Sequence, residues 1–223
     1  VYQRMGKVHE KINDPHNAVR YYEKLLGGTI ECMGNRHFGA YRVRDKLLYF
    51  RLKIGAKTVE QVEIEGKLLF EDARADLSMR DPITLVTAHH FGEFLSATMN
   101  KYTEAVKYFR KAYYNRKQVL GEDSPYTLVS QYGLAFNLAK IHEFKEGYTL
   151  LQDVIQRFDA NAEFGPAHDV TVAAVCSYVE LCKISHDKGE AEVNMRRLLM
   201  HYQQAYGHSS SKALDMMQQI KNL

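Results

Sequence analysis

The chain repeats one short pattern five times. Equivalent small or short side chains recur at spacings of 44, 43, 42 and 44 residues, at Ala18, Val62, Ala105, Gly147 and Ala191. A fixed period of roughly 20 to 50 residues is typical of solenoids, in which each repeat is one supersecondary unit that stacks on its neighbours. The pattern therefore predicts a stack of repeats, an architecture that provides an extended binding surface more readily than a catalytic pocket.

Signals for helix ends recur with the same period. Gly34, Gly121 and Gly207 each follow a helical run, sixteen residues after the equivalent small residue. Glycine suits the left-handed position that often ends a helix. Asp81 and Ser124 each precede a proline, and both are good N-cap residues for a helix whose first turn contains proline. Each repeat is therefore predicted to contain two helices.

The predicted helices form two series. The first helix of each pair is expected over 38–53, 82–98, 126–141, 168–184 and 209–222. The second helix is expected over 15–33, 57–78, 102–119, 144–161 and 188–206. The hairpins then span 1–34, 38–78, 82–120, 126–162 and 168–207, with 209–222 as a capping helix. We expect residues 1–11 to be the end of a first helix with a turn over 5–9, and residues 1–223 to be one solenoid within a longer protein.

Composition narrows the class of protein. The 223 residues are 45% hydrophobic and 26% charged, an ordinary balance for a globular protein. No apolar run approaches the roughly 18 residues of a membrane span, and a net charge of +3 gives no basis for nucleic-acid binding. Cys32, Cys176 and Cys182 show no metal-binding spacing and fit a reducing compartment. We expect a cytoplasmic protein with no cofactor, nucleic-acid partner or direct membrane insertion.

The second helices carry a family resemblance. Ala105, Phe109 and Ala112 follow one another at i, i+4 and i+7, a spacing that places them on one helix face. This order of small, aromatic and small side chains resembles the second helix of the tetratricopeptide repeat. The segment 120–128 resembles the linker of kinesin light chain repeats, whose period is longer than the typical roughly 34 residues. The copy around Val62 departs from the pattern, because Gly66 replaces the aromatic residue.

The resemblance covers nearly the whole chain and is strongest over 82–160. It implies an all-α, right-handed superhelical solenoid of antiparallel helix hairpins, with about five repeats and a C-terminal helix. It also implies a non-enzymatic scaffold for protein–protein interaction, such as an adaptor in transport or signalling. In this family the first helices line a concave groove that binds a partner peptide or helix.

Kinesin light chains commonly carry paired asparagines in that groove, and this chain lacks them. The matching positions hold His89-His90, Tyr132-Gly133 and Cys176-Ser177. The resulting groove is predicted to be aromatic and of mixed charge, which suits an amphipathic partner. Its candidate residues are Lys46, Phe50, His89, Glu93, Tyr132, Phe136, Lys140 and Glu180. An alternative is that Phe50 and Phe136 point into the hairpin core, because the rotation of a helix does not follow from its sequence.

A second candidate surface lies on the second helix of the third hairpin. Its basic residues are Lys107, Arg110, Lys111 and Lys117. They lie opposite the apolar face of Ala105 and Phe109, so they are expected on the convex side. A charged face of this kind is ordinarily just solvated, and the functional alternative is a contact surface for acidic partners.

Besides a binding scaffold, the sequence allows a structural role and argues against catalysis and metal binding. A structural solenoid could mediate self-association or pack on another domain of its own chain. An enzyme is not expected, because the sequence has no G-x-S-x-G, Walker or Rossmann glycine pattern. Nor is a metal site, because the adjacent His89 and His90 would point about 100° apart on a helix and could not easily share one ion.

Overall fold

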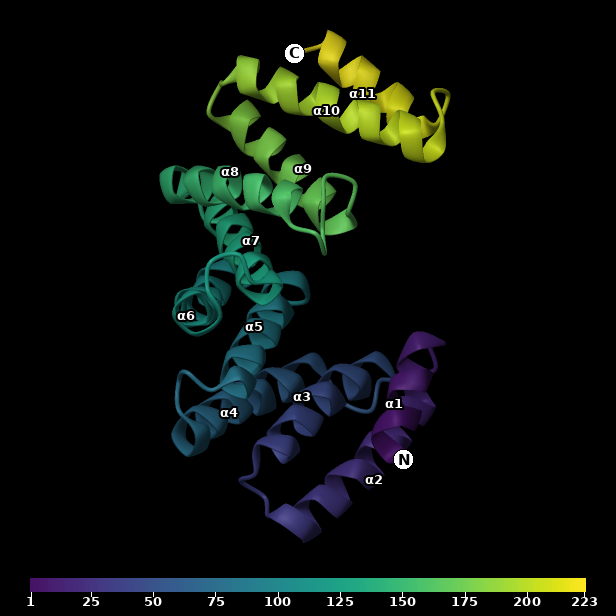
Figure 1. Ribbon diagram of the computed structural model, residues 1–223, viewed down its shortest axis with the longest axis vertical. Helices are drawn as coiled ribbons and strands as arrows, with labels where there is room; N and C mark the ends of the chain where they lie inside the picture. Colours follow the sequence, from purple (N-terminus) through teal and green to yellow (C-terminus); the bar gives the residue numbers. More distant parts are fainter. The chain divides into compact units, whose positions relative to one another are not determined.

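The computed structural model describes residues 1–223 and contains eleven helices and no strand (Figure 1). The helices are α1 (Tyr2–Lys11), α2 (Pro15–Met33), α3 (Phe38–Lys53), α4 (Val59–Leu77), α5 (Pro82–Ala97), α6 (Tyr102–Leu120), α7 (Pro125–Lys140), α8 (Phe144–Ala160), α9 (Asp169–Ile184), α10 (Lys188–Tyr206) and α11 (Ser211–Lys221). The predicted all-α fold class is confirmed. Every helix predicted from residue 15 onward is present, with each end within two residues of the prediction.

The prediction for the N-terminal residues was wrong. Residues 5–9 lie inside α1, and the turn follows at Asn13. Gly6 suggested a turn, but its role is close packing: a Cβ atom there would lie only 2.8 Å from the ring of Tyr22. The absent side chain therefore allows α1 and α2 to approach closely.

Left-handed residues mark the junctions between hairpins. They are Gly34, Ser78, Gly121, Gly165 and Gly207, with φ values of +88°, +97°, +87°, +75° and +88°. The N-cap residue of the next first helix lies three residues after each of them. Three of these five positions were visible as glycines in the sequence pattern, whereas Ser78 was hidden because serine rarely adopts this conformation.

A second series of left-handed residues reverses the chain inside each hairpin. It consists of Asn13, Gly55, Asn100, His142 and His186, with φ between +53° and +70°. Asparagine and histidine tolerate the left-handed region better than most side chains. Because the series has no common residue type, sequence reasoning missed it, yet its regular recurrence identifies five hairpins.

The first helices begin with different caps. Asp81 accepts a hydrogen bond from the backbone amide of Ile83 at 2.8 Å, as its position predicted. Ser124 precedes α7 but its side chain forms no cap hydrogen bond. His37 and His168 instead use an imidazole nitrogen, which accepts from a backbone amide two residues later at 3.2 Å in both cases.

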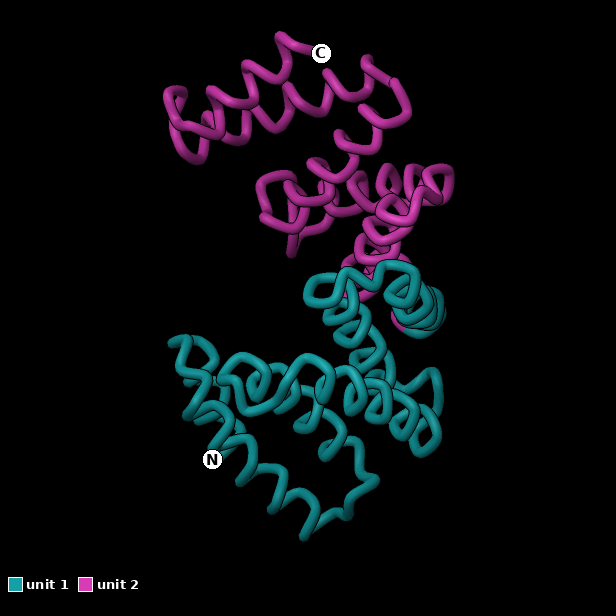
Figure 2. Tube along the Cα trace, turned by 180° about the vertical axis from the view of Figure 1, so that it is seen from behind, with its two compact units in different colours: residues 1–119 teal, residues 120–223 magenta.

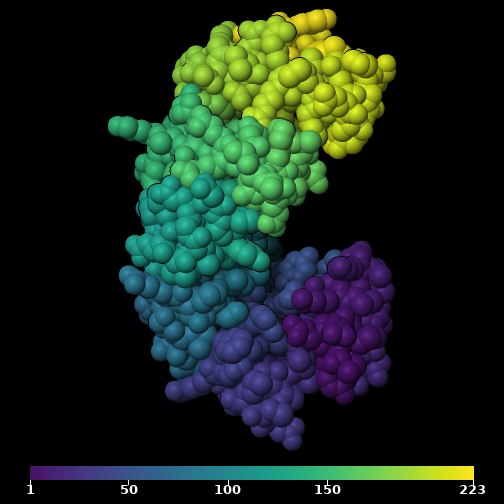
Figure 3. All heavy atoms as spheres, in the orientation of Figure 1, coloured from purple at the N-terminus to yellow at the C-terminus, as the bar shows by residue number.

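The chain divides into two compact units, residues 1–119 and 120–223 (Figure 2). The single solenoid over 1–223 stays a prediction. Within each unit, side chains fill the spaces between neighbouring helices (Figure 3).

The repeated small residues lie in the cores. Ala18, Ala105 and Ala191 are fully buried, and a Cβ atom at Gly147 would lie 3.3 Å from the carbonyl oxygen of Ala135. These positions therefore permit close contact between the two helices of a hairpin. Larger apolar side chains surround them, and the main cluster of unit 2 includes Leu128, Leu151, Phe158, Val175 and Met195.

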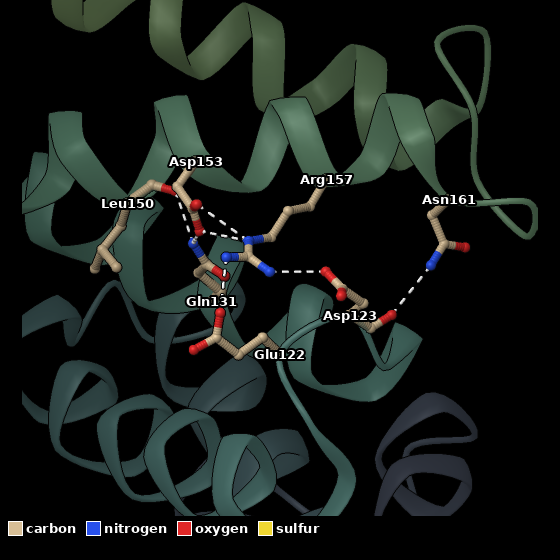
Figure 4. A network of polar contacts seen from close by, with 7 residues as sticks. All are labelled: Glu122, Asp123, Gln131, Leu150, Asp153, Arg157 and Asn161. Carbon is tan, nitrogen blue, oxygen red and sulfur yellow. Dashed lines mark hydrogen bonds and ion pairs between the residues drawn. The ribbon is translucent and has the colours of Figure 1, made fainter.

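Unit 2 also contains a network of polar contacts around Arg157 on α8 (Figure 4). The guanidinium group contacts Asp153 at 3.0 Å, Asp123 at 2.7 Å and Glu122 at 2.8 Å. The side-chain amide of Gln131 on α7 donates to the same Asp153 at 2.7 Å. The network therefore ties the segment before α7 to both α7 and α8.

Candidate functional site

A groove of about 570 Å³ lies in unit 1 between α3 and α5, with α4 forming its floor. We call it the unit 1 groove. This volume falls within the range of roughly 300 to 1,000 Å³ that is usual for binding sites. The larger apolar side chains of its lining are Leu48, Tyr49, Phe50, Leu52, Val62, Leu69, Phe91 and Phe94. Its charged or titratable lining consists of Glu10, Asp45, Lys46, Lys53, His90 and Glu93.

At the degraded repeat copy, the floor of the groove is covered by a side chain of the next helix instead of one from α4. Val62, Gly66 and Leu69 form one row of α4 at i, i+4 and i+7. Phe91 of α5 packs directly on Gly66, where a Cβ atom would lie 2.7 Å from its ring. The edge of the Phe91 ring also meets Tyr108, with ring centroids 4.8 Å apart. Phe91 thus supplies an aromatic ring that α4 lacks, and no large side chain rises from Gly66 into the groove.

The aromatic walls differ in exposure. Tyr49 is 59% exposed and meets the edge of Phe50 with ring centroids 4.9 Å apart. Phe94 is partly exposed and stacks on Phe91, with ring centroids 6.1 Å apart. Phe50 is only 7% exposed and belongs to the core cluster that contains Tyr22. Phe50 is therefore oriented mainly into the hairpin core, and only part of its side chain lines the groove.

The two lysines of the groove already have partners. Lys46 forms an ion pair with Glu10 of α1 at 2.7 Å, and the hydroxyl of Tyr22 donates to the same carboxylate at 2.7 Å. Lys53 donates to the side-chain carbonyl of Asn13 at 2.6 Å. The positive charge that Lys46 was expected to add is therefore largely compensated by Glu10.

The adjacent histidines contact different carboxylates. His90 Nδ1 lies 2.6 Å from Asp45 Oδ2 across the two first helices, whereas His89 Nε2 lies 3.3 Å from Glu93 Oε1 on its own helix. His90 lines the groove. His89 is buried and meets the edge of Phe109 with ring centroids 5.3 Å apart. The candidate His89 thus does not line the groove but contacts Glu93, which does. Its neighbour His90 faces the groove.

These environments shift the pKa values in opposite directions. Burial lowers the pKa of His89, and the hydrogen bond and charge of Glu93 offset only part of that effect. Burial also lowers the pKa of His90, but contact with Asp45 outweighs it and the net pKa is raised. Burial raises the pKa of Glu93, but His89, His90 and the buried Arg116 of α6 outweigh it and lower the net pKa. Glu93 is therefore ionised near neutral pH, beside a neutral His89.

Three predicted groove residues of unit 2 form a stripe along α7. Tyr132 and Phe136 have ring centroids 6.3 Å apart, and Lys140 Nζ lies 5.2 Å from the centroid of Phe136. The hydroxyl of Tyr132 lies 3.4 Å from Ser177 Oγ on α9. Tyr132 and Phe136 are both partly exposed. The fourth predicted residue, Glu180, is 69% exposed along its side chain and pairs with Lys183 of its own helix at 3.1 Å.

The predicted basic surface on α6 is less uniform than its sequence suggests. Lys107 and Arg110 are exposed, and Lys117 is partly buried. Lys111 Nζ lies over the ring of Phe70 at 5.0 Å and over that of Tyr108 at 5.3 Å. Lys111 therefore covers aromatic surface between α4 and α6, an arrangement that stabilises the fold through cation–π contacts.

Two segments match family models of the tetratricopeptide repeat, at residues 84–126 and 1–27. The chain carries tetratricopeptide repeats. Repeats of this family in general mediate protein–protein interaction and are typically non-enzymatic scaffolds. None of the curated proteins compared with the chain matches it in sequence.

Solved structures give the same fold. A Podosopora anserina protein described as a kinesin light chain with nearly identical TPR-like repeats is 15% identical, with a TM-score of 0.72 over 91% of this chain and 93% of that one. BtubC (BKLC) from P. vanneervenii is 12% identical, with a TM-score of 0.77 over 94% of this chain and 82% of that one. The repeats therefore resemble those of kinesin light chains in fold.

Sequence reasoning missed several residues that line the unit 1 groove. Asp45, Tyr49, Phe91 and Phe94 were not among the candidates, although all lie on the first helices of adjacent tetratricopeptide repeats. A signal did exist: Asp45 and His90 are 45 residues apart, as are Tyr49 and Phe94. Aligning the two repeats on this spacing would have paired their groove-facing sides.

None of the eleven helices is both long and apolar enough to cross a membrane.

Proposed function

We propose that the chain is a non-enzymatic interaction module that binds an amphipathic peptide or helix of a partner protein in the unit 1 groove. The observation that carries this proposal is an open, largely apolar groove between the first helices of two adjacent repeats. A role as an adaptor or scaffold in transport or signalling follows from the family. Three free cysteines fit the reducing environment of the cytoplasm, where we place the protein.

Burial of partner side chains supplies the binding energy in this proposal. Tyr49 and Phe94 present apolar surface at the walls, and the ring of Phe91 covers Gly66 at the floor. Burying one large apolar side chain contributes about 1.5 to 3 kcal/mol before the costs of association. The charged rim then fixes the orientation of the partner. The α7 stripe of Tyr132, Phe136 and Lys140 is proposed as a further contact, because its two rings are partly exposed.

A substitution that fills the groove tests the proposal. Ala97 lines the groove and is exposed, so Ala97→Leu adds apolar volume at its mouth without displacing buried atoms. Ala75→Leu, on an exposed position of α4 outside the groove, is the matched control. Peptides selected from a random phage-displayed library on the wild-type chain serve as probes in fluorescence polarisation. We expect Ala97→Leu to weaken the selected peptides about tenfold or more, which is about 1.4 kcal/mol. If the selected peptides bound wild type, Ala97→Leu and Ala75→Leu with equal affinity, binding in the unit 1 groove would be contradicted.

One observation favours self-association as the second candidate function. Ile64 and Leu68 lie one turn apart on α4 and are 62% and 57% exposed. Leu68 also lines a smaller cavity of about 330 Å³ with Leu26 and Leu47. Exposed apolar clusters often mark interaction surfaces. Light scattering tests this candidate, since a clean monomer at high concentration would count against it.

A further inference from the structure

We propose that the segment bound in the unit 1 groove carries a basic side chain next to its apolar anchor, and that Glu93 and Asp45 receive this charge. The inference rests on the proposed function and adds the chemistry of the partner. It follows from the way in which the charges of the groove are already paired.

The two lysines of the groove already have partners on α1 and at the turn that follows it. Three carboxylates line it, those of Glu10, Asp45 and Glu93, against two lysines. Lys46 pairs with Glu10, and Lys53 is hydrogen-bonded to Asn13. Asp45 and Glu93 contact histidines, at 2.6 Å and 3.3 Å, and the charge of the buried Arg116 on α6 also acts on Glu93. Above the raised pKa of His90 both imidazoles are neutral, and the two carboxylates outnumber this one arginine, so this part of the groove is electronegative.

The electronegative part adjoins the aromatic walls. The contact between Asp45 and His90 joins α3 to α5, and the two helices run in the same general direction (Figure 1). Tyr49 lies one turn beyond Asp45, and Phe94 lies one turn beyond His90. One helical turn advances about 5.4 Å along the axis. A partner that buries an apolar side chain between Tyr49 and Phe94 therefore places a neighbouring side chain beside the carboxylates.

Glu93 is able to accept a cation there. Its side chain is 57% exposed, and its contact with His89 is to a neutral imidazole. A carboxylate offers about four acceptor sites, and hydrogen bonds to an ammonium or guanidinium group are roughly twice as strong as neutral ones. An acidic partner side chain at the same place would be repelled by both carboxylates. The charge pattern thus favours lysine or arginine over glutamate or aspartate.

His90 makes this recognition sensitive to pH. The charged and titratable groups around it are Asp45 on α3, Glu93 and His89 on α5, and the buried Arg116 on α6. When His90 takes up a proton, it compensates Asp45 and repels a partner cation. The affinity for a basic segment should therefore fall as the pH is lowered through the raised pKa of His90.

Selection from an unbiased peptide library tests the proposal on the full chain. Random dodecapeptides displayed on phage are selected on the wild-type protein, and clones that bind Ala97→Leu equally well are discarded. We expect the remaining groove-dependent peptides to carry lysine or arginine beside an aromatic or aliphatic residue. In the best peptide, exchanging that basic residue for glutamate should weaken binding to wild type more than about tenfold.

Variants then assign the effect to the carboxylates. Glu93→Gln and Asp45→Asn should each reduce the discrimination between the basic and acidic peptides to about threefold or less. Glu31→Gln removes an exposed carboxylate of α2 outside the groove and should leave the discrimination unchanged. Thermal unfolding by circular dichroism checks that each variant is folded.

Each other outcome has a distinct meaning. Groove-dependent peptides that are acidic, or that show no charge preference, would overturn the basic partner and leave the proposed function standing. Basic peptides whose discrimination survives both carboxylate substitutions would overturn the assignment to Glu93 and Asp45. If no selected peptide distinguishes wild type from Ala97→Leu, the proposed function fails and this inference fails with it.

Discussion

At the residue scale, two adjacent histidines of one helix acquire opposite properties from their surroundings. His89 is 7% exposed, whereas the side chain of His90 is half exposed and contacts a carboxylate that is nearly buried. Burial disfavours the protonated form of both, and only His90 has a partner that outweighs it. A sequence pattern cannot show this difference, because Asp45 lies 45 residues away from His90 along the chain.

The first prediction concerns the source of the raised pKa of His90. Asp45→Asn removes the charge but keeps the burial, so the pKa of His90 should fall below its ordinary value of 6.5. The raised pKa stabilises the fold fully below the unfolded-state pKa, and this contribution is lost as pH rises through the folded-state pKa. The variant should therefore lose stability mainly in mild acid. A histidine titration by NMR measures the pKa, and urea unfolding at pH 5 and pH 8 measures the stability.

His89 provides the internal control for that titration. Its pKa is lowered, so its titration midpoint should lie below that of His90 in the wild-type chain. If the order of the two midpoints were reversed, or if Asp45→Asn left the midpoint of His90 in place, the contact with Asp45 would not be the cause.

At the element scale, each repeat is delimited by two left-handed residues, and the identity of those residues varies. The junction series contains four glycines and Ser78, whose backbone adopts φ 97° and ψ 163°. Such backbone angles are nearly exclusive to glycine. The helices that flank the junction were nevertheless predicted within two residues, because apolar periodicity and the proline after Asp81 mark them independently. Sequence reasoning thus found the helices but not the strained junction.

The second prediction follows from that strain. Ser78→Gly should raise the free energy of unfolding by about 1 kcal/mol, because the relief of about 1 to 3 kcal/mol of backbone strain exceeds the added entropy of an unfolded glycine. Ser78 is exposed, so no packing is lost. Urea denaturation measures the change. Ser78→Ala keeps the strain and should show no such gain, and a similar gain in both variants would point to the side chain instead of the backbone.

The third prediction concerns the polar network of unit 2. Arg157→Met should lower stability by about 1 kcal/mol, because one guanidinium group holds three carboxylates from α8 and the segment before α7. Roughly 1 M salt shortens the Debye length to about 3 Å and should reduce the difference from wild type.

Arg196→Met is the matched control for Arg157→Met. Arg196 pairs only along its own helix with Glu192 and is 63% exposed along its side chain. Such a pair contributes about 0.3 to 0.5 kcal/mol. Equal losses in the two variants would mean that the network adds nothing beyond ordinary surface pairs.

At the scale of the whole molecule, the fold follows from what the repeats share, and the candidate site follows from where they differ. Ala18, Ala105 and Ala191 share a buried position, so their period predicted the hairpins correctly. The groove lies at Gly66, where the copy departs from the pattern. Sequence reasoning recognised Gly66 as a departure but could not foresee its consequence, because the ring that packs on it belongs to the next helix.

The same contrast explains which properties of the candidate groove residues were predicted correctly. Lys46, Phe50 and Glu93 do line the unit 1 groove, because first helices of adjacent repeats face it. The compensation of Lys46 by Glu10 and the burial of Phe50 depend on tertiary contacts with α1 and α2, which helix periodicity does not contain. The position of a groove is therefore predictable from the repeat, while its charge and depth are not.

The last prediction restores the repeat pattern and removes the groove. The pair Gly66→Phe with Phe91→Leu returns an aromatic residue to α4 and an aliphatic one to α5. Gly66→Phe alone should destabilise the chain, because even a Cβ atom there would lie 2.7 Å from the Phe91 ring. In the double variant the smaller residue at 91 relieves part of this clash, so it should be more stable than Gly66→Phe alone.

The new ring of the double variant should occupy the floor of the unit 1 groove. Groove-dependent peptides should then bind at least about tenfold more weakly, as they do to Ala97→Leu. Phe91→Leu alone is the control, since it leaves position 66 without a side chain and should retain most of the binding. Thermal unfolding and fluorescence polarisation measure the two effects separately. A stable double variant that bound peptides with wild-type affinity would show that the absent aromatic side chain at Gly66 is not what creates the binding site.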